Sequence, residues 1–320
     1  LWAKELEWYF VFLRPPGLRL NLNFINKNEN KNIYVYGKDA VVEIDNGKNV
    51  IVDGVTAPMT AGNKTVGIYL ENTGTGSIFN GNGNLEVKNE AIGVYSKGNN
   101  SLNINITADG EKTTGVFIDG GSSVSGTVTV KGTGTAGAIG IYGDNGKITI
   151  NSSGLTLNTD TNKGTGIYLT NGAYIEGNDI TINNTAGIKN IGVYYNKGIS
   201  EKTLTNKAAI KLIGSDNIGI YAAGGVKLIN TKNIESTAAG TSNNIASYIQ
   251  GNSSLISNGN ITMAGADNIG IYTGKGTGVN SGIIDISGGT GTSSAGMVAK
   301  TDTAADTATV ENKNKITVGS

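Results

Sequence analysis

The sequence predicts an all-β fold, a right-handed parallel β-helix (a three-sided β-solenoid) with about 25 residues per coil and about ten coils. Three observations lead to this prediction. One short phrase recurs at nearly constant spacing, each interval carries three short runs of strand-forming residues, and glycine and asparagine separate the runs. Units of this kind must stack on one another to bury their apolar side chains, which favours a rod.

The recurring phrase is Gly-Ile-Tyr, with conservative replacements in some copies. The ten copies begin at Gly67, Gly93, Gly115, Gly140, Gly166, Gly192, Gly219, Ala246, Gly270 and Gly296. Successive copies are 22 to 27 residues apart, and the last one, Gly296-Met297-Val298, is degenerate. A period of this length indicates one supersecondary unit repeated along the chain.

Each unit holds three strand signals separated by turn residues. In the unit around Gly140 they are residues 139–142, 147–151 and 155–158. Strands this short would leave most edges open if they paired within the unit, but each can pair with its counterpart in the next unit. The result is three parallel sheets whose neighbouring strands lie about 4.8 Å apart. Crossovers between parallel strands are nearly always right-handed, which sets the expected hand.

Successive side chains of a β-strand point to opposite faces, which predicts the residues of the phrase that face the core. In the copy 218–221, alternation places Ile218 and Ile220 in the core, and Gly219 and Tyr221 on the outside. The residue after the aromatic is often apolar too, and we expect it to be buried. A glycine column beside an aromatic column would leave bare backbone across which the rings can lie.

The chain divides into three regions by composition. Residues 1–24 contain both tryptophans and both arginines, and form either an N-terminal cap or an unrelated flank. Residues 25–60 carry strand-like runs that we expect to form a first, irregular β coil. Residues 61–320 are the regular β-helix repeats. We expect the whole to be a segment of a longer protein.

The composition excludes several classes of chemistry. The chain has no cysteine and no histidine, so disulfides, thiolate zinc sites, a cysteine nucleophile and a histidine base are ruled out. Lys plus Arg and Asp plus Glu both number 25, a balance that does not favour nucleic acid. We predict no cofactor, no metal and no catalytic residue, and therefore no enzymatic activity.

The aromatic column is the candidate binding feature. Its members share one position in successive coils: Tyr69, Tyr95, Phe117, Tyr142, Tyr168, Tyr194, Tyr221, Tyr248 and Tyr272. Their rings would stack at about 4.8 Å on the outside of the rod. One interpretation is a ladder that stabilises the sheet. The other is an aromatic strip that binds sugars or a partner protein.

A second column, two residues after the aromatic, contains charges. Asp119 and Asp144 would be neighbours there, and two carboxylates about 5 Å apart are what a retaining glycosidase uses. Exposed charges are mostly solvated, which favours a plain surface interpretation. Residues 132–137 match the GxGxxG spelling, but a new coil follows rather than a helix, which indicates a turn.

The extended phrase Asn-Ile-Gly-Ile/Val-Tyr, at residues 190–194, 217–221 and 268–272, resembles the passenger region of large type V autotransporters. It is most similar to the Asn- and Gly-rich adhesin-type passengers of fusobacteria, and the likeness covers roughly residues 61–320. The resemblance implies an extracellular β-helical stalk used for adhesion, carried to the cell surface by a C-terminal outer-membrane barrel. No binding residues of the family form a fixed motif that could be transferred.

We therefore expect a non-enzymatic, surface-displayed passenger segment that mediates adhesion or displays an adhesive region as a stalk. The alternatives are a β-helical polysaccharide-degrading enzyme and a purely structural spacer. The partners that the resemblance implies are host or bacterial cell-surface proteins or glycans, with no nucleic acid. We expect membrane attachment only through the barrel, and a monomeric rod.

Overall fold

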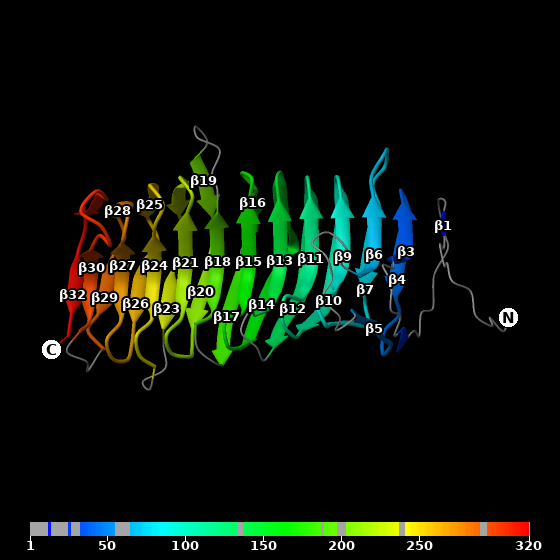
Figure 1. Cartoon of the computed structure of the whole chain (residues 1–320), viewed down its shortest axis with the longest axis horizontal. Helices are drawn as coiled ribbons and strands as arrows, with labels where there is room; N and C mark the ends of the chain where they lie inside the picture. Colours follow the sequence, from blue (N-terminus) through cyan, green and yellow to red (C-terminus); the bar gives the residue numbers. More distant parts are fainter. Residues whose placement is uncertain are drawn as a thin grey trace.

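The computed structural model describes residues 33–54, 65–132, 137–178, 180–186, 189–196, 203–236, 241–288 and 293–319, together with the strand pairing of two short N-terminal segments. These residues form a parallel β-solenoid with about 26 residues per coil, which confirms the predicted fold class (Figure 1). Strands of the same side lie next to one another along the rod, and the N- and C-terminal coils lie at opposite ends. No described segment forms a helix that is long and apolar enough to cross a membrane.

The first sheet contains twelve strands, all paired in parallel. They are β1 (Phe12–Leu13), β3 (Ile33–Lys38), β6 (Val66–Glu71), β9 (Ile92–Lys97), β11 (Thr114–Asp119), β13 (Ile139–Asp144), β15 (Thr165–Thr170), β18 (Ile191–Asn196), β21 (Ile218–Ala223), β24 (Ile245–Ile249), β27 (Ile269–Thr273) and β30 (Ala295–Ala299). The ten copies of the phrase occupy the ten strands from β6 to β30. Of the N-terminal flank, the structure describes only the pairing of β1, so the interpretation of residues 1–24 lies outside the described residues.

The second sheet contains fifteen strands. Its main path is β2 (Ile25–Asn26), β5 (Asn49–Asp53), β8 (Asn84–Lys88), β10 (Asn100–Asp109), β12 (Ser122–Gly132), β14 (Lys147–Thr161), β17 (Ile180–Ala186), β20 (Ala208–Leu212), β23 (Ile234–Ser236), β26 (Ile261–Met263), β29 (Ile284–Ile286) and β32 (Ile316–Val318). Beside this path lie β4 (Val41–Ile44), β7 (Ile78–Gly81) and β16 (Tyr174–Gly177). The third sheet has five strands: β19 (Thr203–Asn206), β22 (Lys227–Asn230), β25 (Ser253–Ser257), β28 (Gly276–Asn280) and β31 (Ala308–Asn312).

The number of strands per coil differs between the two halves of the rod. Strands β10, β12 and β14 are 10, 11 and 15 residues long and run continuously around a corner. The predicted runs 147–151 and 155–158 both fall within β14, so two expected strands are one. From β19 onwards the same two sides are separate strands in separate sheets, as predicted.

Glycine permits the corner in the long strands. Gly126 of β12 lies opposite Ile104 of β10 and has a φ of 108°. A Cβ atom at this position would lie 2.0 Å from the carbonyl oxygen of Ile104, so only glycine fits. The register between β12 and β14 shifts between Val124 and Gly126, directly before this glycine.

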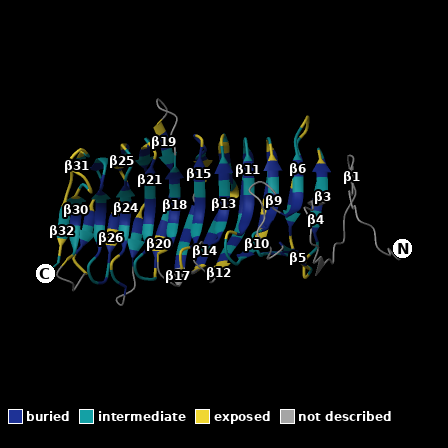
Figure 2. Ribbon diagram, viewed as in Figure 1, coloured by how far each residue is buried: buried dark blue, intermediate teal, exposed yellow. Residues whose placement is uncertain are grey.

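Mainly aliphatic side chains fill the inside of the coils as one continuous core. Buried residues recur in coil after coil along the ribbon (Figure 2). From β6 to β27 the second aliphatic of the phrase is buried, as in Ile68 and Ile220, and so is the residue after the aromatic, as in Leu70 and Ile249. These parts of the predicted facing are confirmed.

The predicted facing of the glycine was wrong, and that of the first aliphatic was wrong from β13 onwards. The glycines of the phrase point into the core. A Cβ on Gly93 would lie 2.6 Å from Cγ2 of Val87 and 2.6 Å from the carbonyl oxygen of Gly115. The first aliphatic is buried at Ile92, but it is partly exposed in the later coils, as in Ile218. Simple alternation fails because the glycine and the aliphatic after it both face inwards. The glycine column lies where the strands of the first sheet pack closely against the second sheet.

Buried asparagines form a ladder at the corner before the phrase. The side-chain oxygens of Asn217, Asn244 and Asn268 each accept the backbone N–H of the ladder residue one coil earlier, at 2.9 Å. Asn190 begins the ladder by accepting the N–H of Gly164 at 2.7 Å, and all four asparagines are fully buried. The adjacent Asp216 adopts a turn conformation with a φ of 55°, so the ladder follows a turn directly.

Candidate functional site

The aromatic column is present as predicted, and it begins one coil earlier. All nine predicted residues lie in register, and Tyr36 of β3 adds a tenth ring next to Tyr69. Neighbouring ring centroids are 4.7 to 5.6 Å apart along the whole column. The rings are half-buried on the outer face of the first sheet. The column ends at Val298, which pairs with Tyr272 in β27.

Most of the rings stack with their planes nearly parallel. The interplanar angles are 6° to 18° for seven of the nine neighbouring pairs. Tyr194 is the exception, since its plane is turned by 78° from Tyr168 and by 76° from Tyr221. Beside it, the hydroxyl of Tyr168 accepts a hydrogen bond of 2.7 Å from Nδ2 of Asn196.

The residue after Tyr194 is also unusual. Tyr195 occupies a core position and is fully buried, where other coils have a smaller side chain. Its hydroxyl donates to Oδ1 of Asn206 at 3.1 Å, and Nδ2 of Asn206 donates to Oδ1 of Asn230 at 2.9 Å. Tyr195 therefore joins the first sheet to a second internal asparagine ladder, in the third sheet.

Stacking decides which parts of the rings remain available. An offset-stacked pair of aromatic rings contributes about 0.5 to 1.5 kcal/mol beyond its burial, so the column stabilises the sheet. The same contacts cover the ring faces, leaving the edges and hydroxyls toward solvent. The column thus offers a row of phenol groups rather than a row of open ring faces for stacking sugars.

The phenol groups hold their protons tightly. A hydrogen bond to Glu71 raises the pKa of Tyr36 to about 12. Burial is the main cause that raises the pKa of Tyr95 and of Tyr194 to about 12. These hydroxyls are neutral hydrogen-bonding groups over the whole ordinary pH range.

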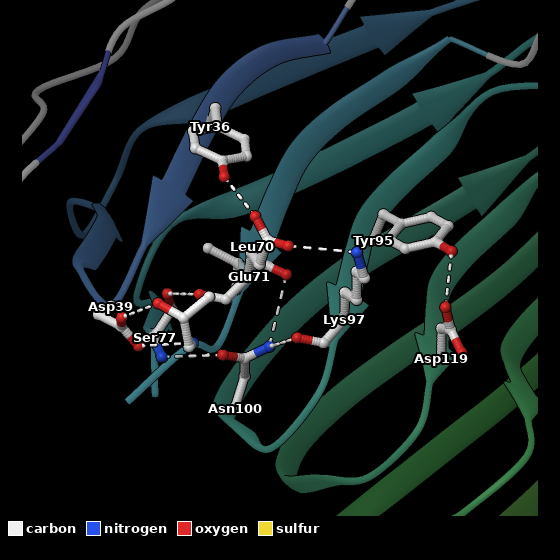
Figure 3. A network of polar contacts seen from close by, with 10 residues as sticks. Tyr36, Asp39, Leu70, Glu71, Ser77, Tyr95, Lys97, Asn100 and Asp119 are labelled. Carbon is white, nitrogen blue, oxygen red and sulfur yellow. Dashed lines mark hydrogen bonds and ion pairs between the residues drawn. The ribbon is translucent and has the colours of Figure 1, made fainter. Parts of the chain in front are cut away.

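Charged residues lie next to the aromatic column at the ends of the N-terminal strands (Figure 3). Lys38, Glu71, Lys97, Asp119 and Asp144 are in register on successive coils. Nζ of Lys97 lies 3.2 Å from Oε1 of Glu71. The hydrogen bond from Tyr36, followed by that from Lys97, lowers the pKa of Glu71, and the bond to Glu71 raises the pKa of Lys97.

Asp119 and Asp144 are neighbours on adjacent coils, as the sequence predicted. Asp119 accepts a hydrogen bond of 3.3 Å from the hydroxyl of Tyr95, and Asp144 accepts one from Nδ2 of Asn171. Both carboxylates are thus engaged by neutral donors of the scaffold on the outer face. Among the described residues, no group of three or more acidic side chains is placed to hold a metal ion.

Asp39 is a structural carboxylate that the sequence did not single out. Its Oδ1 accepts the backbone N–H groups of Thr73, Gly74 and Gly76, each at 3.1 Å, and its Oδ2 accepts the hydroxyl of Thr73 at 2.7 Å. These bonds lower the pKa of Asp39, with the Thr73 hydroxyl as the largest cause. Only the coil register reveals this contact, because the partners are more than thirty residues apart.

A second charged column lies on the second sheet and alternates in sign. Asp53, Lys88, Asp109, Lys131 and Asp160 are paired one after another in β5, β8, β10, β12 and β14. Opposite charges on neighbouring strands stabilise a sheet, whereas like charges destabilise it. The charges of this half therefore mainly secure the register of the coils.

The chain has no match among protein-family models, curated proteins or solved structures. The functional argument consequently depends on the geometry of the coils and on the columns they display. Of these, the aromatic column is the most extended, since it runs through ten coils without a gap.

Proposed function

We propose that this chain is a segment of a non-enzymatic, surface-displayed passenger protein of the autotransporter type, which mediates adhesion or displays an adhesive region as a stalk. The main support is the uninterrupted stacking of coils, in which ten copies of one phrase occupy ten successive strands of one sheet. A rod of this kind holds what it carries at a fixed distance from its base.

The resemblance of the repeated phrase to adhesin-type passengers supplies the location and the partners in this proposal. The chain acts outside the cell, anchored to the outer membrane in the full-length protein. Its partners are proteins or glycans on host or bacterial cells. On the rod itself, the exposed hydroxyl edges of the aromatic column are the surface that a partner would contact by hydrogen bonding.

The test is a cell-adhesion assay with beads coated with the chain. The variant Tyr221→Thr/Tyr248→Thr removes two stacked rings from the column but keeps strand-forming residues. The control is Ile256→Thr, which changes a side chain that is 38% exposed on the third sheet. Adhesion that the Tyr variant loses and the control keeps would support a binding column.

Two other outcomes separate the remaining hypotheses. Adhesion that is equal for all three proteins would place binding elsewhere on the rod. No adhesion by any of them, with the fold intact by circular dichroism, would contradict the adhesive role and leave a spacer.

The alternative enzymatic function has one observation in its favour, the pairing of Asp119 with Asp144. A panel of neutral and acidic polysaccharides incubated with the chain would test it. Release of reducing ends that disappears in Asp144→Asn would overturn the non-enzymatic proposal.

A further inference from the structure

The outer face of the first sheet carries four columns of side chains in a fixed order along each strand. A corner residue comes first, then a β-branched residue, then the aromatic, and then the residue two positions later. The β-branched residue is buried at Ile92 and Thr114 and partly exposed from Ile139 to Ile269. On β9 these are Glu90, Ile92, Tyr95 and Lys97, and on β11 they are Lys112, Thr114, Phe117 and Asp119. The corner column and the end column flank the face on its two sides.

The charges of the two flanking columns are opposite on each of these coils. The coil of β9 has Glu90 at the corner and Lys97 at the end, and the coil of β11 has Lys112 at the corner and Asp119 at the end. In these coils neighbouring charges along each column also have opposite signs, as shown by Glu90 with Lys112 at 3.1 Å and by Glu71 with Lys97 at 3.2 Å. From β13 to β27 no coil has a charge at both flanks: the coil of β24 has none, and each of the others has one.

We propose that a second copy of this chain docks on this face, with the two rods parallel and related by a twofold axis along the rod. Across the interface, this symmetry reverses the order of the four columns. It also places each coil of one rod beside the same coil of the other rod. Glu90 then lies opposite the partner's Lys97, and Lys112 lies opposite the partner's Asp119. The β-branched column of each rod faces the aromatic column of the other, so small side chains meet large ones.

The charges select one register of the two rods. A shift by one coil places Glu90 opposite the partner's Glu71 or the partner's Asp119, which have the same sign. Like charges that face each other across an interface repel, so the shifted arrangements are disfavoured. The coils from β13 to β27 have no pair of opposite charges at their flanks and supply the more apolar centre, through partly exposed residues such as Ile191, Ile218 and Ile269.

The size of the face suits a stable dimer. The nine centroid steps of 4.7 to 5.6 Å make the aromatic column about 45 Å long. A six-residue strand spans about 20 Å, so the face measures about 900 Å². A standard specific interface buries about 800 Å² on each partner. The dimer differs from the expected monomeric rod, and it does not depend on the proposed adhesive role. It covers the aromatic column, so a cell-surface partner that contacts this column would compete with the second copy.

Sedimentation velocity on two charge-reversal variants tests the proposal. In Lys97→Glu and in Glu90→Lys, each homodimer brings like charges together at two places, so we expect dimerisation about tenfold weaker or more. In an equal mixture of the two variants, both contacts again join opposite charges, and we expect the heterodimer to form as tightly as the wild type. The control Lys211→Glu reverses a charge on the second sheet, where Lys211 pairs with Glu235 at 3.8 Å.

A single variant could fail to dimerise because it is unfolded. The mixture excludes this explanation, since a heterodimer forms only if both variants are folded. A wild-type chain that stays monomeric into the high micromolar range would overturn the proposal. So would single variants that dimerise like the wild type, or a mixture that stays monomeric although circular dichroism shows both variants folded.

The orientation has its own test, because the chain contains no cysteine. A short bismaleimide should link Glu90→Cys chains to Lys97→Cys chains when the two are mixed, and should link neither variant to itself. Efficient linking within one variant alone would contradict the parallel twofold arrangement.

Discussion

The coils of β10, β12 and β14 and the coils after Tyr195 turn the same corner by different means. In the first group, β12 bends within one long strand, and Gly126 allows the backbone to pass the carbonyl of Ile104. After Tyr195, the chain divides into separate strands, and buried corner residues such as Asn206 and Asn230 bond to each other from one coil to the next. The bend of β12 thus depends on a glycine, whereas the later coils from β19 to β28 each place a buried polar side chain at the corner: Asn206, Asn230, Ser257 and Asn280.

The two solutions have different energetic weaknesses. Glycine carries extra conformational entropy in the unfolded chain, which lowers stability by roughly 0.5 to 1 kcal/mol relative to alanine. A buried amide must instead find partners for all of its polar atoms. In the third-sheet ladder Oδ1 of Asn280 has no hydrogen-bond partner, and in the ladder before the phrase Nδ2 of Asn217 and of Asn244 has none, so both ladders are incompletely satisfied. At its corners the repeat thus accepts either the conformational entropy of a glycine or the unsatisfied polar atoms of a buried side chain.

The largest effect is expected from Gly126→Ala, which disrupts the glycine corner. Its Cβ would lie 2.0 Å from the Ile104 oxygen at a φ of 108°, and backbone atoms cannot move away locally. We expect a loss of about 3 kcal/mol or more in the free energy of unfolding. Urea denaturation measures it, with Gly74→Ala as the control, since the nearest atom to that Cβ is 3.7 Å away. Equal stability of the two variants would contradict the role of the glycine bend.

Asn217→Ala tests a buried amide in the other half, at the corner before the phrase. It removes the acceptor of the buried Asn190 N–H, and we expect a loss of about 1 to 3 kcal/mol by urea denaturation. The matched control is Asn233→Ala. That exposed side chain also accepts a backbone N–H, from Asn260 at 3.1 Å, but water can replace it. A control that loses as much as Asn217→Ala would show that burial is not the deciding factor.

Tyr195→Phe acts at the junction of the two halves. The change keeps the buried ring and removes the hydroxyl that donates to Asn206. We expect a loss of about 1 kcal/mol, the usual contribution of one hydrogen bond, by thermal or urea denaturation. Separate unfolding transitions for the two halves in this variant would show that Tyr195 also couples them, and no change at all would contradict its role.

Alkaline pH should affect both halves alike, since the aromatic column is the feature they share. Tyr95 and Tyr194 have pKa values of about 12 when folded, against a reference of 10.0. The folded chain keeps protons that the unfolded chain releases, so the free energy of unfolding falls as the pH rises from about 10 to 12. The phenolate absorbance of these two residues, measured as the difference between the wild type and Tyr95→Phe/Tyr194→Phe, should appear at higher pH in the folded chain than in the urea-denatured chain. Titration at the same pH in the folded and the urea-denatured chain would contradict this expectation.

The sequence predicted the coils and the aromatic column because both depend on spacing alone. Phrases 22 to 27 residues apart must coincide when coils stack, and the aromatic position follows. Tyr36 was not predicted as part of the aromatic column because it lies 33 residues before the next ring and lacks the glycine of the phrase. Asp119 and Asp144 were placed correctly as neighbours for the same reason of spacing.

The remaining features depend on backbone geometry that a periodic pattern does not contain. The inward glycines, such as Gly93, follow from a break in alternation next to Val87 of the adjacent side. The asparagine ladders require the corner residues of successive coils to lie in register, and asparagine is also typical of ordinary turns. Strand alternation and composition therefore identify the faces of the coil, and the corners need the structure.

The alternating column of the second sheet has a consequence for how such a rod can change its length. Deleting the coil that carries Asp109 would bring Lys88 against Lys131, two like charges. Deleting two successive coils would instead leave Lys88 against Asp160, a favourable pair. In this part of the rod, gain or loss of two coils therefore keeps opposite charges next to each other. Gain or loss of a single coil brings like charges together.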